Sequence, residues 1–503
     1  MERTVNQGPP TSLINDAYSS AGFDELSKAW QLTMAQHLDR MLTGESRVLN
    51  WQDPRQAVAL AESFLTSAPQ QSGQSVADRR ERFTTLLDQM IASGQNLHNP
   101  RYIGHQVPAS VPIAGLFDAV GSITNQPMAI YEMGPWATAV EHALVRGLCR
   151  KVGWDPDLSS GVLTHGGSLA NLTALLTARN AALPDSWENG TPNKAVLIAH
   201  ADAHYCVTRA AGLLGLGTRQ VVKAPLDDRR RMDPQQLDHA LTTCRANGQT
   251  VIAVAAAACA TPIGAFDPLS DIAEVCDRHG VWLHVDAAHG GGALMSKQHR
   301  KLLRGIENAD SVVWDAHKML FMPALCAAVL YKNKSHRFNS FQQDAPYLFD
   351  PSSPGLAEFD NGISTVECTK RSTGFGLWGL WSMFGEEIFE QLVDHTFAMT
   401  RYVYQQIDAA DDFESCHVPE CNILVFRYLP AGITDAALED QNRFQQQLRT
   451  TLIQSGEFYI VQTTLDGKVC LRLTVMNPIT TEGHLDQLMA KIREIGLSIL
   501  QSQ

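Results

Sequence analysis

Between Arg101 and Arg371 the chain alternates short apolar, largely β-branched runs with stretches of helical periodicity. The apolar runs lie at 161–164, 195–198, 251–254, 282–285 and 311–314, and the helical stretches include 169–180, 208–214 and 269–279. Strands that alternate with helices in this way form a mainly parallel sheet covered on both faces. We therefore predict an α/β fold with its ligand site at the carboxyl ends of the strands.

The flanking segments predict two further units, since 503 residues are too many for one ordinary core. Residues 1–99 show helical patterns at 26–42 and 76–92 around a loop at 69–73. They have too few apolar residues for a core of their own, so we expect them to cover the rest of the chain or a partner subunit. Residues 376–503 show a helical stretch (376–407) and two strand patterns (422–426 and 469–474), which predicts a smaller α+β domain after a large domain at 100–375.

Charge and composition exclude several classes of partner. The net charge of −13 disfavours nucleic acid and anionic membranes as partners. The longest apolar stretch, 251–260, is about half of the roughly 20 residues that a membrane-spanning helix requires. The ten cysteines are scattered without a spacing suited to zinc, so we expect no metal site and reduced thiols in a cytoplasmic protein.

Two strand ends carry the most informative chemistry. Asp315-Ala316-His317-Lys318 directly follows the run 311–314, and Asp286 ends the run 282–285. A lysine can hold pyridoxal phosphate (PLP) as a Schiff base, and a carboxylate can keep its pyridine nitrogen protonated. A surface His-Lys pair and a loop-capping Asp are the ordinary alternatives for each motif alone. Together the two motifs favour a PLP enzyme, in which His317 could contact the phosphate.

Three other strand ends add groups that suit the same cofactor. Gly166-Gly167-Ser168 opens a helix after a strand, where free N–H groups and the helix dipole favour an anion. His204 lies between a strand and a helix and could stack on the pyridine ring, although a helix cap is the simpler local interpretation. Thr261 could hydrogen-bond the ring, and a plain turn threonine is an equally good interpretation.

In combination these segments resemble the group II PLP-dependent amino-acid decarboxylases, from about residue 99 to residue 478. The resemblance implies PLP fold type I, with a seven-stranded type of sheet, and a homodimer whose active site lies at the subunit interface. It also implies a role for eight positions in cofactor binding. These are Lys318 as the Schiff-base lysine, Asp286 as the pyridinium partner, His204 as the stacking and catalytic histidine, Gly167 and Ser168 at the phosphate, and Thr261, Ala288 and His317 as further contacts.

The resemblance also indicates a substrate class. The stretch 345–351 resembles the catalytic loop of the glutamate and cysteine-sulfinate branch, which implies that Tyr347 protonates the substrate carbon after CO2 leaves. Arg472 falls where that family has an arginine that grips the substrate carboxylate, a task that suits a guanidinium. His105 and Gln106 belong to the substrate-side loop, which is similar to diaminobutyrate decarboxylases as well.

We therefore expect decarboxylation of an L-amino acid, with an acidic substrate (glutamate, aspartate or cysteine sulfinate) as the first choice. A diaminobutyrate or aromatic amino-acid decarboxylase is the alternative within the family. A different PLP reaction, such as transamination or carbon–sulfur lysis, is the alternative outside it, because one fold can host several chemistries. A catalytically inactive binding protein is disfavoured, since Lys318, Asp286, His204 and Tyr347 are all present.

Three segments depart from the family pattern. Asp315-Ala316 stands where Asn-Pro is common, Cys259-Ala260 replaces Gly-Thr, and His289 replaces an aromatic residue. None of these changes removes a group that PLP needs, so cofactor binding should be retained. They leave the choice of substrate open.

Overall fold

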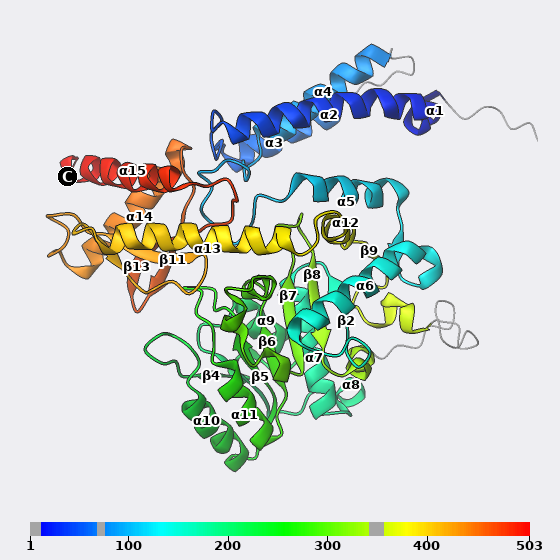
Figure 1. Ribbon diagram of the computed structural model, residues 1–503, viewed down its shortest axis with the longest axis vertical. Coiled ribbons are helices and arrows are strands. Elements are labelled where there is room, and N and C mark those ends of the chain that lie inside the picture. The colour runs from blue at the N-terminus through cyan, green and yellow to red at the C-terminus, as the bar shows by residue number, and fades with distance from the viewer. Residues whose placement is uncertain (1–11, 68–75, 342–356, 503) are drawn as a thin grey trace, which may run out of the picture.

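The computed structural model describes residues 12–67, 76–341 and 357–502 (Figure 1). Its centre is a seven-stranded sheet with the order β2-β8-β7-β6-β5-β3-β4. The strands are β2 (Ser160–Thr164), β3 (Ala195–His200), β4 (Val221–Ala224), β5 (Thr250–Ala257), β6 (Leu283–Asp286), β7 (Ser311–Asp315) and β8 (Ala327–Tyr331). All five predicted strands lie in this sheet.

The sheet is mainly parallel, as predicted. The pairs from β7 through β6, β5 and β3 to β4 are parallel, and only β8 runs the other way, against both β7 and β2. Because β2 and β7 are each antiparallel to β8, β2 points in the same direction as the parallel strands. Their carboxyl ends therefore meet at one edge of the sheet.

Helices cover both faces of the sheet because the strand side chains alternate between two buried clusters. Val196 and Ile198 pack on the side of α6, α10 and α11, whereas Leu197 and Ala199 pack on the side of α7 and α9. The bounds of these helices are α6 (Pro135–Val152), α7 (Gly167–Ala182), α9 (Tyr205–Leu213), α10 (Pro234–Ala246) and α11 (Leu269–His279). Both faces are thus buried, which explains the nearly continuous apolar strand sequences.

The carboxyl-terminal part has its own antiparallel sheet with the order β10-β11-β13-β12. Its strands are β10 (Phe413–Ser415), β11 (Ile423–Tyr428), β12 (Val461–Leu465) and β13 (Lys468–Thr474), and α13 (Glu387–Asp408), α14 (Leu438–Ser455) and α15 (Glu482–Gln501) pack around it. A separate apolar cluster joins this sheet to the three helices. The predicted boundaries 1–99, 100–375 and 376–503 remain a prediction.

The stretch 376–407, predicted as one helix, forms two. α12 (Phe375–Phe384) ends at Gly385, whose φ of 68° is left-handed, and α13 starts two residues later. Gly385 has no Cβ, so it takes this conformation at little cost and redirects the chain.

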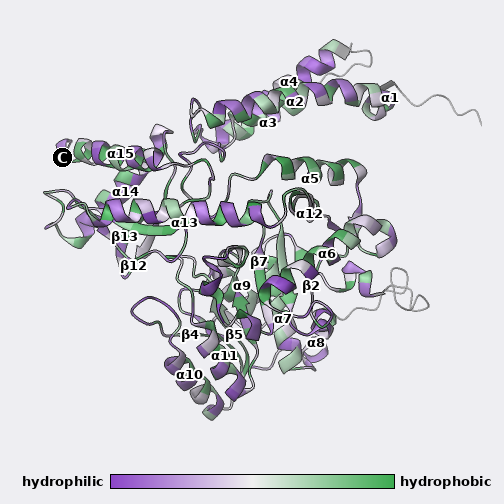
Figure 2. Cartoon of the chain, in the orientation of Figure 1, coloured by the Kyte–Doolittle hydropathy of each residue, from purple (hydrophilic) through white to green (hydrophobic). Residues whose placement is uncertain are grey.

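The amino-terminal helices stand away from the sheet (Figure 1). They are α1 (Ser12–Tyr18), α2 (Ser20–Leu42), α3 (Pro54–Thr66) and α4 (Val76–Ala92), and the predicted loop at 69–73 lies outside the described residues. α2 buries only Ala29, Thr33 and Met41, and the hydropathy colours in Figure 2 show polar and apolar residues mixed along these helices. In the described part of the chain no helix is long and apolar enough to cross a membrane.

Candidate active site

A cavity of about 280 Å³ lies at the carboxyl edge of the large sheet. The eight residues predicted to bind the cofactor all line it, although five different strand ends supply them. They are Gly167 and Ser168 after β2, His204 after β3, Thr261 after β5, Asp286 and Ala288 at β6, and His317 and Lys318 after β7. The common direction of these strands is what brings residues so far apart in sequence into one wall.

Lys318 lies in the turn after β7, beside two carboxylates. Its Nζ is 3.3 Å from Oδ2 of Asp315, a side chain only 1% exposed. Burial alone would lower the pKa of Lys318, but attraction to Asp315 and Asp286 outweighs burial and raises it. Lys318 is therefore held as an ammonium ion until another group takes over the two carboxylates.

Asp286 ends β6 and has a carboxylate oxygen available for a ligand. Oδ1 accepts a hydrogen bond from the N–H of Ala288 at 3.1 Å, and the side chain also attracts Lys318. A partly buried carboxylate needs a cationic or donor partner. A protonated ring nitrogen in the cavity would supply it.

The turn before α7 forms an anion site that is held in place by a side chain of the same helix. Gly166 has a φ of 102°, which turns the chain from β2 into α7 and leaves the first N–H groups of a 16-residue helix facing the cavity. Asn171 donates to the carbonyl of Gly167 at 2.9 Å and is itself bonded to the buried His284. This support fixes the turn whether or not an anion is bound.

His204 fits both interpretations that the sequence left open. Its Nδ1 accepts a hydrogen bond from the N–H of Cys206 at 3.3 Å and so caps α9, and the ring also lines the cavity. Burial lowers its pKa, and Lys318 lowers it further against the opposing effect of Asp286. The ring is therefore neutral at physiological pH, as suits a group that stacks on a flat ligand.

The residues predicted to bind the substrate do not all line the cavity. Gln106 lines the cavity, whereas the exposed His105 lies beside Tyr459, with ring centres 5.7 Å apart. Arg472 stands behind the wall and donates from Nη2 and Nε to the carbonyl oxygens of Thr261 and Pro262, at 2.9 and 3.1 Å. Tyr347 lies outside the described residues.

Several wall residues were not predicted as site residues. Asp315 is the most prominent, since it is buried beside Lys318 and its Oδ1 has no hydrogen-bond partner. His165 Nδ1 lies 2.7 Å from Oε1 of Glu367, and His165, Cys259 and His289 line the same cavity. The signal for three of them was present, because Asp315, Cys259 and His289 are positions where the sequence departs from the resembled pattern.

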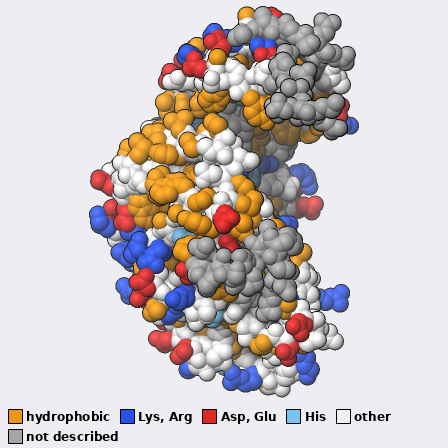
Figure 3. Space-filling model, turned by 90° about the vertical axis from the view of Figure 1, so that its right-hand side faces the viewer, with side chains coloured by type: hydrophobic (Ala, Val, Ile, Leu, Met, Phe, Trp, Pro, Cys, Tyr) orange, Lys and Arg blue, Asp and Glu red, His pale blue; other side chains and the backbone are white. Residues whose placement is uncertain are grey.

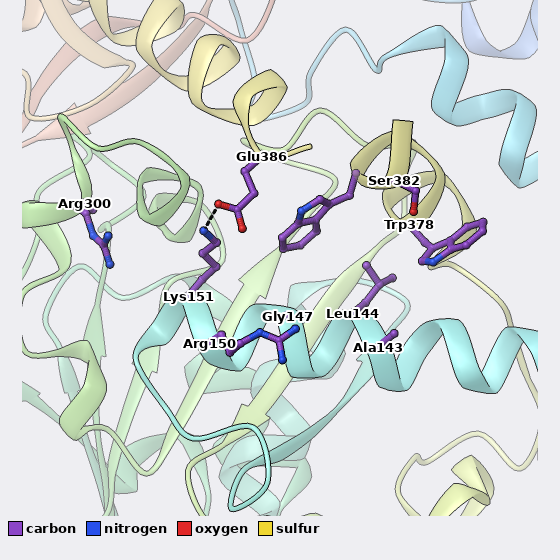
Figure 4. A pocket seen from close by; sticks show the side chains of 10 residues that line it. Ala143, Leu144, Gly147, Arg150, Lys151, Arg300, Trp378, Ser382 and Glu386 are labelled. Carbon is purple, nitrogen blue, oxygen red and sulfur yellow. Dashed lines mark hydrogen bonds and ion pairs between the residues drawn. The ribbon is translucent and has the colours of Figure 1, made fainter. Parts of the chain in front are cut away.

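A larger cavity of about 510 Å³ lies elsewhere, against α6 and α12 (Figure 4). Lys151 and Glu386 form an ion pair within it, and Trp378 and Arg300 line it at opposite ends. None of the predicted site residues lines it. Size alone therefore does not identify the active site.

The chemistry of the small cavity fits pyridoxal phosphate. Lys318 and Asp286 line the same space as the amino-terminus of α7, and the buried Oδ1 of Asp315, another lining residue, has no hydrogen-bond partner. A mainly parallel seven-stranded sheet with these groups at its carboxyl edge defines a PLP-dependent enzyme of fold type I.

Comparison with known proteins agrees with this class. Residues 69–429 match the pyridoxal-dependent decarboxylase conserved domain. The mouse acidic amino acid decarboxylase GADL1 is 30% identical over 99% of this chain and 89% of its own length. Mouse cysteine sulfinic acid decarboxylase is 31% identical over 90% of this chain and 92% of its own. The chain belongs to the pyridoxal-dependent decarboxylase family.

Solved structures show the same fold. The crystal structure of mouse CSAD matches with a TM-score of 0.86 and 29% identity, over 95% of this chain and 99% of that one. A rice TDC structure with PLP and tryptamine matches equally well in fold, with a TM-score of 0.86 at 21% identity. The protein is thus a PLP-dependent carboxy-lyase that acts on an amino acid, as predicted.

Proposed function

We propose that this enzyme decarboxylates an acidic L-amino acid, such as glutamate, aspartate or cysteine sulfinate, to the amine and CO2. The observation that carries the proposal is the meeting of Lys318, Asp286 and the α7 turn in one cavity, in a chain about 30% identical to decarboxylases named for acidic substrates.

Eight residues would hold the cofactor. Lys318 would carry it, Asp286 would pair with its ring nitrogen, and Gly167 and Ser168 would bind its phosphate through backbone N–H groups and the hydroxyl. The remaining contacts come from His204 on the ring face and from Thr261, Ala288 and His317 around it. When bound, PLP supplies an electron sink for the pair of electrons left behind as CO2 departs.

Arg472 would bind the substrate carboxylate from behind the Thr261 loop. A guanidinium carries five N–H donors, and the bonds to Thr261 and Pro262 use two of them. The buried Arg472 side chain also brings positive charge behind a wall on which Lys318 faces the carboxylates of Asp286 and Asp315. This local charge would favour an acidic substrate in a protein that is negative overall.

Proton transfer falls to two groups in this proposal. Tyr347 would protonate the substrate carbon after CO2 leaves, and the neutral ring of His204 would assist. The role of Tyr347 is inferred from its sequence context alone. His204 has supporting geometry, since its Nδ1 is occupied by Cys206 and only Nε2 remains to act in the cavity.

We also propose that the enzyme is a cytoplasmic homodimer with its active sites at the subunit interface. One face of α5 (Pro112–Thr124) exposes Leu116, Val120 and Ile123, at 52, 53 and 63%. Figure 3 shows the side of the molecule that lies on the right in Figure 1, and hydrophobic side chains gather across its middle. Apolar surface of this kind marks protein interfaces. The ten free cysteines suit a reducing compartment.

A CO2-release screen of the PLP-loaded enzyme against single L-amino acids tests the substrate class. Release from glutamate, aspartate or cysteine sulfinate is the expected result. Release only from diaminobutyrate or an aromatic amino acid would overturn the acidic substrate and retain decarboxylation. Products that keep the carboxylate, with no CO2 from any amino acid, would contradict decarboxylation itself.

A further inference from the structure

Two thiols and one imidazole meet beside the cofactor cavity. Cys259 follows β5, His289 follows β6, and Cys421 precedes β11, so the group joins the two sheets. One ligand atom from each lies within 4.8 Å of the others, and the two sulfur atoms are 3.9 Å apart. Among the described residues this is the one cluster of His, Cys and acidic groups with such a geometry. All three side chains are buried.

The tautomer of His289 leaves a lone pair on Nδ1. Asn422 Nδ2 donates to the carbonyl of Val475 at 2.8 Å, which turns Oδ1 of Asn422 toward His289 Nε2, also at 2.8 Å. Nε2 must therefore carry the proton, and Nδ1 is a bare acceptor. Nδ1 is buried and has no hydrogen-bond partner.

A buried unpartnered acceptor is costly unless something binds it. In metal sites, a ligating histidine is oriented by a hydrogen bond from its other ring nitrogen, as Asn422 provides here. The imidazole is thus prepared to donate to a cation.

The two thiols have the space that a soft-metal site needs. Gly264 has a φ of 76°, and a Cβ there would collide with the sulfur of Cys421. The hydrogen bond to Cys421 and burial raise the pKa of the Cys259 thiol, so a cation that binds here has to displace the thiol proton. Two thiolates on a divalent cation would give no net charge, so the buried group would not be an isolated ion. Sulfur and imidazole ligands select zinc over magnesium or calcium.

We propose that Cys259, Cys421 and His289 Nδ1 form a binding site for Zn²⁺ at the side of the cofactor cavity. Cys259 and His289 also line that cavity, which gives the ion a route inward. Zinc with three protein ligands takes water as the fourth. The bound ion would tie the loop that carries Thr261 to the start of β11, across the junction of the two sheets.

Equilibrium dialysis of untagged, PLP-loaded enzyme against Zn²⁺, with a non-thiol reductant present, tests the site. We expect about one tightly bound zinc ion per chain by mass spectrometry, and a loss of affinity of at least about tenfold in Cys421→Ser. Cys421 does not line the cofactor cavity, so the absorbance of bound PLP reports whether this variant is folded.

Cys416→Ser is the matched control, because Cys416 belongs to the other close thiol pair, with its sulfur 3.6 Å from that of Cys470. The control should bind zinc as the wild type does. Zinc binding that survives Cys421→Ser, or that is lost in Cys416→Ser, would overturn the proposal, as would a wild-type enzyme that retains no zinc.

Crystals of the wild-type enzyme soaked in Zn²⁺ give a second test that needs no variant. An anomalous peak at the zinc edge is expected between the sulfur atoms of Cys259 and Cys421 and Nδ1 of His289. No peak at this position, or peaks confined to surface side chains, would refute the site.

Discussion

Asp315 determines how readily Lys318 can react. Formation of a bond to a carbonyl carbon requires the neutral amine, and Asp315 lies 3.3 Å from the ammonium that must lose its proton. An opposite charge at this range raises an amine pKa by about one unit or more. Asp315 therefore holds the cofactor-free enzyme in its less reactive form at neutral pH.

Asp315→Asn should make cofactor capture faster at neutral pH. Because Asp315 and Asp286 raise the pKa of Lys318, removal of one carboxylate lowers that pKa and increases the neutral fraction of the amine. The midpoint of the capture rate against pH should move down by about one unit. Stopped-flow absorbance of apoenzyme mixed with PLP measures it.

Asp310→Asn is the control for that experiment. Asp310 is a half-buried carboxylate that directly precedes β7, at the other end of the strand from Asp315. Its midpoint should stay at the wild-type pH. Equal shifts in both variants, or an upward shift in Asp315→Asn, would contradict the role of Asp315.

Substitutions of Lys318 and Tyr347 should distinguish cofactor binding from product formation. Lys318→Ala should lose the absorbance of bound cofactor and all turnover. Tyr347→Phe should keep that absorbance and lose normal amine production, because only the proton donor is removed. Absorbance spectra and product analysis on one substrate distinguish them. Wild-type amine yield from Tyr347→Phe would remove this residue from the mechanism.

The α7 turn depends on a glycine because Asp315 lies directly behind it. A Cβ on Gly167 would be 2.6 Å from Oδ2 of Asp315, so Gly167→Ala must displace the turn or the carboxylate. We expect a cost of about 1–3 kcal/mol in unfolding free energy, together with weaker PLP binding. Thermal unfolding and cofactor titration measure the two effects.

Gly483→Ala provides a matched substitution in the first turn of α15. A Cβ there meets only Oγ1 of Thr481, at 3.9 Å, so this variant should be neutral or slightly more stable. If Gly167→Ala behaved in the same way as Gly483→Ala, Asp315 could not be the constraint.

The free edge of the sheet at β2 is closed by a buried ion pair. Lys370 Nζ contacts both carboxylate oxygens of Glu141, at 2.6 and 2.7 Å, and donates to the carbonyl of Leu163 at 2.6 Å. Glu141 in turn accepts from the N–H of Leu163 at 3.1 Å. The pair thus replaces the hydrogen bonds that a neighbouring strand would make.

Lys370→Met should destabilise the protein by about 3–5 kcal/mol, because it leaves Glu141 buried without a counter-charge. Lys151→Met, which removes an ion pair to the half-exposed Glu386, should cost no more than about 1 kcal/mol. Denaturant titration compares the two variants. Equal costs would show that the edge does not depend on the buried pair.

Elements that pack on two faces could be predicted from the sequence, and elements whose role is set by distant partners could not. The five predicted strands are apolar throughout because helices cover both of their sides. β8 (Ala327–Tyr331) is an exception, because its sequence is also apolar and buried on both faces but was not predicted. Its antiparallel position between β2 and β7 could come only from the structure. Gly385 was the available signal for the break between α12 and α13.

The same limit applies to the candidate site. Motifs at strand ends predicted eight residues that share one cavity, because strand direction brings them together. Cys259, His289 and Cys421 have no informative spacing in the sequence, and only the contact between the two sheets assembles them. Asp315 was visible as a departure from the pattern, but its pairing with Lys318 required the geometry of the turn.

At the scale of the whole molecule, the amino-terminal helices and α5 leave apolar surface that one chain does not cover. Leu116, Val120 and Ile123 lie three and four residues apart, so they form one stripe along α5. Three large apolar side chains exposed along one face of a helix cost free energy in water unless a second surface covers them. A second copy of the chain is the partner that the homodimer proposal requires.

Ile123→Asp should therefore convert the dimer into monomers or weaken it at least about tenfold, because a carboxylate would have to be buried without a partner. Leu158→Asp is the control, since Leu158 is also 63% exposed but lies in the turn before β2 and outside α5. Light scattering over a concentration series gives the mass of each. If the active site lies at the interface, turnover of Ile123→Asp should rise with protein concentration as dimers re-form, whereas Leu158→Asp should show constant specific activity. A wild-type enzyme that is monomeric yet fully active would place the whole reaction within one chain.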